Sequence, residues 1–344
     1  MQTTTVAIIS PPERVARSMP VNFQPGDEAL FQHELVKDIN AVKLLTMKDV
    51  HLLPNGFLSS KMRVVAQSFT SIPKGFPAIK RWIRMIAYQA AARETKDVER
   101  ALFATDEFSN GYFHWVCDVL PRLEAIYNQE TRQRTFLVPA MALFPYVAPS
   151  LEPYDFSSVC TCSWRERIRC SDLMVVTETA PTGNYRPSLM KSLRNRFRTY
   201  FSAGTAGRRL YISRARAPRR RTVNEAQVAD VMTCHGFERV FLEDLSFQEQ
   251  VRLVGSASVL AGNHGAGLAN MAWMLPETTI LELRLRGDSQ NNCYFSLASA
   301  LELKYCYLAC DAASGQRNAH SADLVVDVRR LEQELSAIEE GRPR

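Results

Sequence analysis

The chain has 344 residues, of which 46% are hydrophobic and 23% are charged. This composition is ordinary for a globular protein and disfavours a disordered chain or a coiled coil. The length exceeds what one hydrophobic core usually organises, so we expect two domains. Residues 1–20 contain no sustained apolar stretch, and nowhere do about 18 uncharged apolar residues follow one another. We therefore expect a soluble, cytoplasmic protein without an export signal or a membrane-spanning helix.

The cysteines and the net charge limit the chemistry further. Of the eight cysteines, Cys160, Cys162 and Cys170 form a loose cluster. A zinc site needs paired cysteines or histidines, and this Cys-x-Cys has no matching pair, so we expect free thiols and no bound metal. The net charge of +6 indicates an anionic partner, which is a nucleic acid, an acidic membrane surface or a phosphorylated small molecule. With this charge, the protein can also associate peripherally with a membrane through a basic surface.

The first 185 residues or so are predicted to form a mixed α/β domain. The pattern predicts a helix over residues 78–92, with Arg81, Arg84 and Arg93 on its solvent side. The strand-like runs of this half are residues 64–66, 136–138 and 172–177.

Turn-forming residues at 180–187 precede a basic amphipathic helix near residues 188–202. We place the domain boundary at this turn. It divides the chain into an N-terminal domain at 1–185, a C-terminal domain at 186–325, and a C-terminal helix and tail at 326–344.

Beyond residue 208, strands and helices alternate. Asn224 is predicted as the N-cap of a helix that runs to about Cys234 and ends before Gly236. Ser246 and Glu249 form a capping box that opens the next helix. Alternation at this spacing predicts a parallel sheet in a Rossmann-like domain. The predicted strands are residues 209–213, 238–242, 258–261, 279–283 and 305–308. Two further helices are predicted, one that follows residue 267 and runs to Met274, and one over residues 328–340.

The first candidate site is the turn Gly-Asn-His-Gly-Ala-Gly at residues 262–267, between a buried strand and a helix. Such a turn lies at the carboxyl ends of parallel strands, where ligands bind. Its glycines let the backbone approach a phosphate, the N–H groups at the start of the helix favour negative charge, and His264 can donate a hydrogen bond. The dinucleotide fingerprint is absent because Asn270 stands where a third glycine is needed, and the Walker ending is absent too. The alternative is a tight turn with an incidental histidine.

The second candidate is an arginine-rich loop with five arginines between residues 214 and 221. It follows the first predicted strand of the C-terminal domain, so we expect it to leave the sheet at the same edge as residues 262–267. Guanidinium groups can clamp a pyrophosphate and neutralise a leaving group without a metal. The alternatives are a solvated loop and a nucleic-acid-binding patch at 208–221, although the run lacks the interleaved aromatic residues typical of such patches.

The third candidate is the segment 110–122, which carries His114 and Asp118 one helical turn apart. A carboxylate that orients an imidazole, or that acts itself, suits a general base. The alternative is a buried structural pair beside Pro121.

Glu282 is a further candidate, because a carboxylate in an apolar strand needs a partner. That partner would be a ribose hydroxyl, Arg284 or Arg286. The sequence has no Asp-x-Asp flanked by apolar residues, the usual way to hold a nucleotide sugar through a divalent cation. We therefore expect arginines and helix N-termini, rather than a metal, to neutralise the ligand.

Taken together and in this order, these motifs resemble glycosyltransferase family 61, especially its bacterial members in capsular polysaccharide biosynthesis. The resemblance covers about residues 105–285 and depends on three stretches, 110–123, 208–228 and 236–283. It implies a GT-B-like α/β fold of two Rossmann-like domains facing a cleft, the N-terminal one on the acceptor side and the C-terminal one binding a nucleotide sugar. It also implies inverting transfer without a metal or other cofactor, and a UDP-sugar is the expected donor.

Carried over residue by residue, the resemblance assigns His114 and Asp118 to catalysis, with Arg122 in the same motif. Arg216, Arg219 and Arg220 are weaker candidates, because the family's loop varies there. The implied nucleotide-sugar-binding residues are Ser213, Arg214, Arg221, Asn224, Glu225, Asn263, His264, Gly265, Ala266 and Gly267, to which we add Glu282.

The resulting hypothesis is a single displacement. Arg214, Arg221 and the N–H groups at 265–267 hold the pyrophosphate, while Asp118 or His114, reaching across the cleft, deprotonates a hydroxyl of a glycan or lipid-linked glycan. One alternative is a protein that binds nucleic acid or another anionic polymer through residues 208–221. The other is a catalytically silent relative that only binds nucleotide sugars. The hypothesis itself has no nucleic-acid partner.

Overall fold

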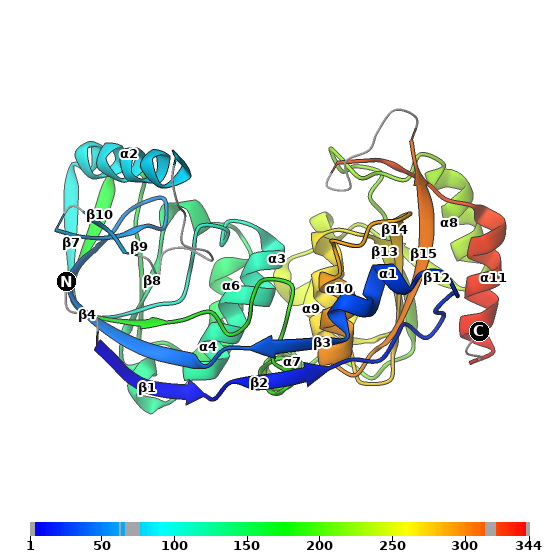
Figure 1. The fold of residues 1–344 in the computed structure, drawn as a ribbon, viewed down its shortest axis with the longest axis horizontal. Helices are drawn as coiled ribbons and strands as arrows, with labels where there is room; N and C mark the ends of the chain where they lie inside the picture. The colour runs from blue at the N-terminus through cyan, green and yellow to red at the C-terminus, as the bar shows by residue number, and fades with distance from the viewer. Residues whose placement is uncertain (1–3, 62, 66–75, 314–320, 342–344) are drawn as a thin grey trace. The chain divides into compact units, whose positions relative to one another are not determined.

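The computed structural model describes residues 4–61, 63–65, 76–313 and 321–341. Contacts within the chain divide it into two compact units, coloured along the chain in Figure 1. The first unit consists of Met1–Glu13 and Ile39–Thr182, and the second of Arg14–Asp38 and Gly183–Arg344. The second unit therefore includes an N-terminal arm, Arg14–Asp38, that is distant in sequence from the rest of the unit.

The first unit is built on an eight-stranded mixed sheet in the order β6-β5-β4-β10-β7-β8-β9, in which β1 also pairs with β4. Strands β10, β7, β8 and β9 run parallel, whereas β4 is antiparallel to β10, β5 and β1. The last four residues of β10 are all buried, as expected for a strand that is covered on both faces. The strands are β1 (Thr4–Ser10), β4 (Val42–Leu52), β5 (Leu58–Ser60), β6 (Arg63–Val64), β7 (Glu94–Phe103), β8 (Thr135–Val138), β9 (Ser158–Thr161) and β10 (Glu166–Val176).

Three of these strands contain the runs predicted from the sequence. Residues 136–138 lie in β8, and 172–176 lie in β10. Of the predicted run 64–66, Val64 lies in β6 and Ala66 lies outside the described residues.

The helix α2 (Phe76–Ala91) confirms the helix predicted over 78–92. Arg84 and Arg93 are exposed as predicted, whereas the side chain of Arg81 lies outside the described residues. Met85 attaches the helix to the unit, because it is buried in a cluster with Leu53 and Phe57. The other helices are α3 (Tyr112–His114), a π-helical turn η3 (Trp115–Val119), α4 (Leu120–Ile126), α5 (Gln129–Arg132), α6 (Val147–Leu151), and the 3₁₀ turns η4 (Ala140–Ala142) and η5 (Glu152–Tyr154).

The second unit contains a six-stranded sheet in the order β12-β11-β13-β14-β15-β16. The first five strands are parallel, which confirms the predicted parallel sheet, and the short β16 is antiparallel to β15. The strands are β11 (Arg208–Ile212), β12 (Phe237–Val240), β13 (Ala257–Asn263), β14 (Thr279–Leu285), β15 (Lys304–Ala312) and β16 (Leu324–Val325).

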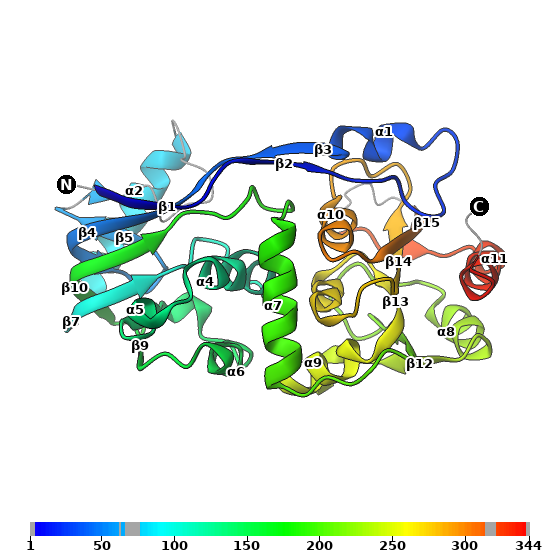
Figure 2. The ribbon, with the colours of Figure 1, turned by 90° about the horizontal axis from the view of Figure 1, so that it is seen from below.

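Helices cover both faces of this sheet (Figure 2). On one face, Val228 and Leu331 join the sheet residues Tyr211 and Leu308 in one buried cluster. On the other face the rings of Phe197 and Trp273 stack with centroids 4.8 Å apart. The helices of the first face are α8 (Glu225–Cys234) and α11 (Val328–Glu339), and those of the second are α7 (Pro187–Tyr200), α9 (Phe247–Gly255), α10 (Cys293–Ala300) and the 3₁₀ helix η7 (Ala266–Trp273).

Local signals set several of these boundaries. The capping box predicted at Ser246 and Glu249 is present at the start of α9. Gly236 follows α8 with a φ of 73°, the left-handed conformation that favours glycine after a helix. Two predictions need correction. The strand predicted over 238–242 already ends at Val240, and the helix predicted after residue 267 is the 3₁₀ helix η7.

The N-terminal arm packs on the sheet of the second unit. It contains β3 (Val36–Ile39), which pairs with β2 (Glu13–Ala16), and the short helices α1 (Glu28–Phe31) and η1 (Gln32–Glu34). Phe31 is fully buried, with its ring centroid 5.0 Å from that of Tyr307. The side chain of Asn22 donates to the carbonyl of Tyr307 at 2.8 Å and accepts from its N–H at 3.1 Å. The amide of Asn22 thus extends the hydrogen bonding of β15.

Candidate functional site

The strand order of the second unit has one reversal point. The chain passes from β11 outward to β12 and then returns to β13 on the other side of β11. In doubly wound sheets, ligands bind at the carboxyl ends of the two strands that flank such a reversal. Ile212 of β11 pairs with Gly262 of β13, so the loops that follow these strands leave the sheet next to each other. These loops are the arginine-rich loop and the 262–267 turn.

Backbone carbonyls of the arginine-rich loop join it to the turn. The side chain of Asn263 donates to the carbonyl of Arg220 at 3.0 Å, and Arg214 Nε donates to the same carbonyl at 3.1 Å. Arg214 Nη2 also donates to the carbonyl of Arg219 at 2.9 Å. Arg220 itself has a φ of 54°, a conformation that L residues seldom adopt outside functional or tightly constrained turns. The loop therefore folds back so that both of its ends lie at β13.

The glycines of the turn permit these close approaches. A Cβ at Gly265 would lie 2.7 Å from Arg214 Nη1, so the guanidinium of Arg214 lies directly against the turn. Gly265 has an extended backbone with a φ of 174°, so crowding rather than conformation requires glycine there. A Cβ at Gly262 or Gly267 would approach Ile212 within 3.2 or 3.3 Å, so these two glycines let β13 and η7 pack closely on β11.

His264 is held by a buried carboxylate. Its Nδ1 lies 2.5 Å from Glu282 Oε1, and the other oxygen of Glu282 accepts from Tyr305. Glu282 is fully buried, and burial alone would raise its pKa, but the adjacent imidazole, Arg284 and the Tyr305 hydroxyl together lower the pKa. The ring of Tyr294 lies edge-on to the imidazole at 4.9 Å. The carboxylate thus keeps its negative charge beside the ring.

The structure gives each oxygen of Glu282 a protein partner. The sequence left a ribose hydroxyl, Arg284 and Arg286 as alternatives, and within the described residues the carboxylate oxygens bond to His264 and Tyr305. Arg286 pairs instead with Asp311 at 2.7 Å.

Arg220 is a site residue that the sequence left among the weaker candidates. Burial lowers the pKa of its guanidinium, while Tyr294 and Glu282 act in the opposite direction, so Arg220 lies within electrostatic range of both. Its Nε is buried and bonds to no atom of the described residues. Burial and the neighbouring Arg220 also lower the pKa of Arg214. Two partly desolvated cations therefore lie beside the turn, and the residue order alone does not reveal which of the five arginines they are.

The other arginines of the loop have carboxylate partners elsewhere. Arg221 is half exposed and pairs with Asp323 through its backbone N–H at 2.8 Å and its guanidinium at 3.3 Å. Arg216 pairs with Asp244 at 2.7 Å and lies over the ring of Phe241 at 3.9 Å. The structure thus does not bring Arg221 to the 262–267 turn.

Ser213 and Glu225 lie together behind the loop. Both are buried, and the hydroxyl of Ser213 donates to Glu225 Oε1. Tyr211 donates to the other oxygen of Glu225 at 2.8 Å, and Arg239 lies 3.3 Å from the first. This network joins the end of β11 to the start of α8.

Asn224 precedes α8 as predicted, but its side chain does not cap the helix. The amide donates to the carbonyl of Val326 at 2.8 Å and accepts from its N–H at 3.0 Å. The helix-capping part of the prediction is therefore wrong, because the chain after β16 offers both a donor and an acceptor.

A second histidine–carboxylate pair lies in the first unit, in the segment after the carboxyl end of β7. His114 Nδ1 lies 2.7 Å from Asp118 Oδ2, at the predicted spacing of one turn. The segment between them is part of a π-helical turn, a feature frequent at functional sites. Thr182, which follows β10, donates to the same oxygen of Asp118 at 3.4 Å.

Burial raises the pKa of Asp118, although His114 and Arg122 oppose that rise. Arg122 is itself engaged, because it pairs with the buried Asp106 at 2.7 Å and donates to the carbonyl of Ala104 at 3.0 Å. Asp106 raises the pKa of Asp118 further, and burial likewise raises the pKa of Glu178 close by. This carboxylate therefore binds a proton more readily than an ordinary aspartate.

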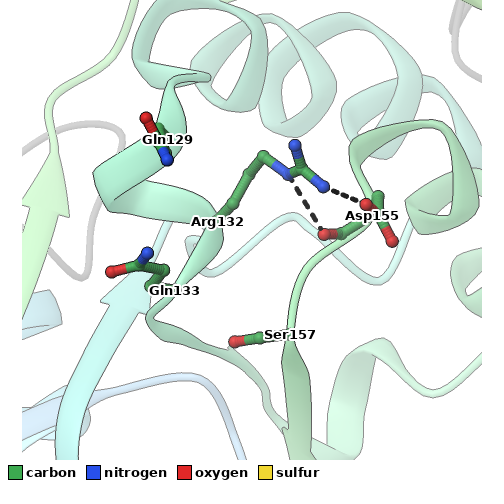
Figure 3. Close-up of a pocket in the computed structure, with 5 residues that line it drawn as sticks. All are labelled: Gln129, Arg132, Gln133, Asp155 and Ser157. Atoms are coloured by element: carbon green, nitrogen blue, oxygen red, sulfur yellow. Dashed lines mark hydrogen bonds and ion pairs between the residues drawn. The ribbon is translucent and has the colours of Figure 1, made fainter.

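A hollow of about 330 Å³ lies elsewhere in the first unit, lined by polar side chains (Figure 3). The ion pair of Arg132 and Asp155 borders it, and Gln129, Gln133 and Ser157 complete its lining. These residues immediately precede β8 and β9, so the hollow lies at the amino ends of parallel strands. Ligands bind at the opposite ends of such sheets, and none of the predicted site residues lines the hollow.

Three general findings concern metals, thiols and membranes. Among the described residues, no group of three or more histidine, cysteine, aspartate and glutamate side chains is arranged to hold a metal ion. All eight cysteines lie in described segments as free thiols. Within the part of the chain that the structure describes, we find no helix with both the length and the hydropathy to cross a bilayer.

Comparison with known proteins identifies the family. The sequence model of the family described as glycosyltransferase 61 matches residues 112–281. That stretch contains the His114–Asp118 pair, the arginine-rich loop and the 262–267 turn. No curated protein matches the chain. This match places residues 112–281, just under half of the chain, in glycosyltransferase family 61, and that family implies a glycosyltransferase activity.

Proposed function

We propose that this protein is an inverting, metal-independent glycosyltransferase that transfers a sugar from a nucleotide sugar to an acceptor hydroxyl. The observation that supports this most is the meeting of two loops at the reversal point of the second sheet, where Arg214 lies against Gly265. Two guanidinium groups beside a glycine turn offer charge-assisted hydrogen bonds to a diphosphate without a metal.

On the donor side, Arg214 and Arg220 bind the diphosphate together with the N–H groups of Ala266 and Gly267. His264 contributes from the same turn. Its Nδ1 contacts the Glu282 carboxylate, so a hydrogen bond to a phosphate oxygen would come from Nε2. Arg221 and Asn263 then shape the loop, through Asp323 and the carbonyl of Arg220. Ser213, Asn224 and Glu225 support the loop from behind.

On the acceptor side, the His114–Asp118 pair supplies the base. Asp118 takes the proton of the acceptor hydroxyl, whose oxygen attacks C1 of the sugar as the bond from C1 to the phosphate oxygen breaks. The nucleoside diphosphate leaves with the electron pair of that bond, and C1 is inverted. The raised pKa of Asp118 supports this role, because a base is more effective when its pKa approaches the operating pH.

The donor, the acceptor and the biological role are proposed by extension from what the family implies. We propose a UDP-sugar as donor, a glycan or lipid-linked glycan as acceptor, and a role in capsular or other surface polysaccharide synthesis at the inner face of the cytoplasmic membrane. The arginine ion pairs weigh against a nucleic-acid-binding function. Arg208, Arg209, Arg216 and Arg221 already face acidic side chains, so the 208–221 segment offers less free positive charge than its composition suggests.

The test is a thermal-shift panel of UDP-, GDP-, CMP- and dTDP-sugars in the presence of EDTA. A ligand at 100 times its Kd stabilises the folded protein by about 2.7 kcal/mol. We expect one nucleotide class to raise Tm with the chelator present, and the purified protein to hydrolyse that donor slowly. Binding without hydrolysis or transfer would identify a silent relative. Binding that disappears with EDTA would contradict the metal-independent mechanism, and tight, steeply salt-dependent oligonucleotide binding would support the nucleic-acid alternative.

A further inference from the structure

The helix α2 of the first unit carries an apolar stripe that faces solvent. Ile79, Trp82 and Ile83 are 54%, 49% and 55% exposed, although large apolar side chains are seldom so exposed together. Their spacing of three and four residues places them on one face of the helix. The helix is attached to the unit through Met85, which is buried with Leu53, and through the partly buried Ile86 at the end of the same stripe. The three exposed side chains are not members of that core cluster.

Basic side chains border this stripe. Lys80 and Arg84 are exposed on the same helix, and Arg93 is exposed shortly after its end. The helix contains no acidic residue. An apolar face flanked by cations is typical of helices that lie in the interface of a membrane, with the long basic side chains directed to the head groups.

A second exposed aromatic residue extends the surface beyond the helix. Trp164, between β9 and β10, is 54% exposed, and its ring lies 6.0 Å from that of Tyr88 in α2. Arg165 is exposed next to it, and its carbonyl accepts the N–H of Arg93 at 2.8 Å. Tryptophan is enriched at membrane interfaces because its ring is apolar and its N–H is polar. The helix α2 and the turn between β9 and β10 thus both expose large apolar side chains next to basic ones.

We propose that this surface, the α2 patch, docks on an anionic lipid bilayer. The α2 patch consists of Ile79, Lys80, Trp82, Ile83, Arg84 and Trp164. Its apolar side chains would enter the boundary between head groups and acyl chains, while its cations contact anionic head groups. Charge favours this occupant over a second copy of the chain, because two such patches would bring cations together. The inference is independent of the transfer reaction, and it adds a place on the membrane where a lipid-linked acceptor would be met.

The experiment is co-sedimentation of the full chain with vesicles of phosphatidylcholine alone or with about one third phosphatidylglycerol. We expect binding to the anionic vesicles that is at least tenfold weaker in the triple variant Ile79→Ser, Trp82→Ser, Ile83→Ser. Arg84→Glu should weaken binding by about tenfold or more, because it changes the charge of the patch by two next to an anionic surface. The matched control is Leu143→Ser with Val159→Ser, which removes apolar side chains of similar exposure in the same unit and should leave binding unchanged.

Tryptophan emission gives a second measurement that does not depend on comparing variants of different stability. Of the four tryptophans, Trp115 and Trp273 are fully buried, so a blue shift on adding vesicles would come from Trp82 and Trp164. Trp82→Phe should reduce that shift by about half. The proposal is overturned if the wild type does not bind anionic vesicles, if the triple variant binds as well as the wild type, or if the triple variant instead dissolves a dimer seen by sedimentation velocity.

Discussion

The two histidine–carboxylate pairs share one contact and differ in their surroundings. In both, Nδ1 of the imidazole faces a buried carboxylate oxygen, at 2.5 Å in His264–Glu282 and 2.7 Å in His114–Asp118. Around Glu282 lie the cation Arg284 and the donor Tyr305, and the balance lowers its pKa. Around Asp118 the cation of Arg122 already pairs with Asp106, and burial prevails, so its pKa rises.

We propose that this difference gives the two pairs different tasks. A carboxylate that stays charged stabilises a cationic imidazole, which suits the binding of a diphosphate. A carboxylate that accepts protons more readily is a better base. Carboxyl groups whose surroundings move their pKa values apart are a recurring sign of divided acid–base roles.

Asp118→Asn should lower kcat by about 10²- to 10⁴-fold, the usual contribution of one positioned base. Asparagine has the same shape and can still bond to His114, so nucleotide affinity should change by less than about twofold. Transfer rates measured by product release, with affinity from titration calorimetry, separate the two quantities. If affinity falls as much as kcat, Asp118 is a structural residue and the comparison between the pairs fails.

Arg220→Ala should weaken nucleotide binding by about 10- to 100-fold, because a hydrogen bond to a charged group contributes about 1.5–3 kcal/mol. Arg214→Ala should weaken binding and slow turnover together, since Arg214 also supports the carbonyls of Arg219 and Arg220. Arg216→Ala is the matched control from the same loop. It pairs with Asp244 at the surface and should leave affinity within about twofold. Unchanged affinity in both Arg214→Ala and Arg220→Ala would remove the diphosphate clamp.

Glu282→Gln should weaken nucleotide binding by about tenfold, because the charged hydrogen bond that orients the His264 ring is lost. The amide preserves the shape of the side chain but removes the carboxylate charge beside the ring. Calorimetric titrations of the nucleotide into wild type, Glu282→Gln and His264→Gln provide the measurement. A purely structural role of Glu282 predicts instead a lower Tm with unchanged affinity.

Thr182→Val should have the smallest effect, a change in kcat of about twofold. Its hydroxyl donates to Asp118 over a long 3.4 Å, and its loss removes a weak stabilisation of the carboxylate. The pKa of Asp118, already raised by burial, should therefore rise slightly further, and the acid limb of the rate profile should move to higher pH. A shift toward lower pH would show that the hydroxyl does not stabilise the charged form.

Much of the second unit could be predicted from the sequence because its signals are local. The capping box of α9, Gly236 and the 262–267 turn each depend on residues within one turn of the chain. The choice among the arginines could not be predicted in this way. Arg221 pairs with Asp323, which lies about a hundred residues further along the chain. Arg220 has a positive φ, which the residue type does not indicate.

Long-range pairing explains what the sequence analysis missed in the first unit. Strand β4 was not predicted, because Lys48 and Asp49 are both exposed and interrupt the alternation of buried and exposed residues along the strand. Its pairing with β1, β5 and β10 joins segments that are distant in sequence. The partners of Glu282 were missed for a similar reason, since Tyr305 comes from the neighbouring strand β15. The His114–Asp118 contact could be predicted because it spans four residues, whereas Asp106, which raises the pKa of Asp118, comes from a separate segment.

The N-terminal arm has a consequence for how the molecule can be synthesised and dissected. Arg14–Asp38 leaves the ribosome well before Phe295 and Tyr307, which its Phe31 contacts. Phe31 therefore stays unburied during synthesis until β15, on which the arm packs, has been made. A fragment that begins at residue 183 would lack the arm and leave Tyr307 without its Asn22 bonds, so a separately expressed second unit needs residues 14–38 joined to it or added as a peptide.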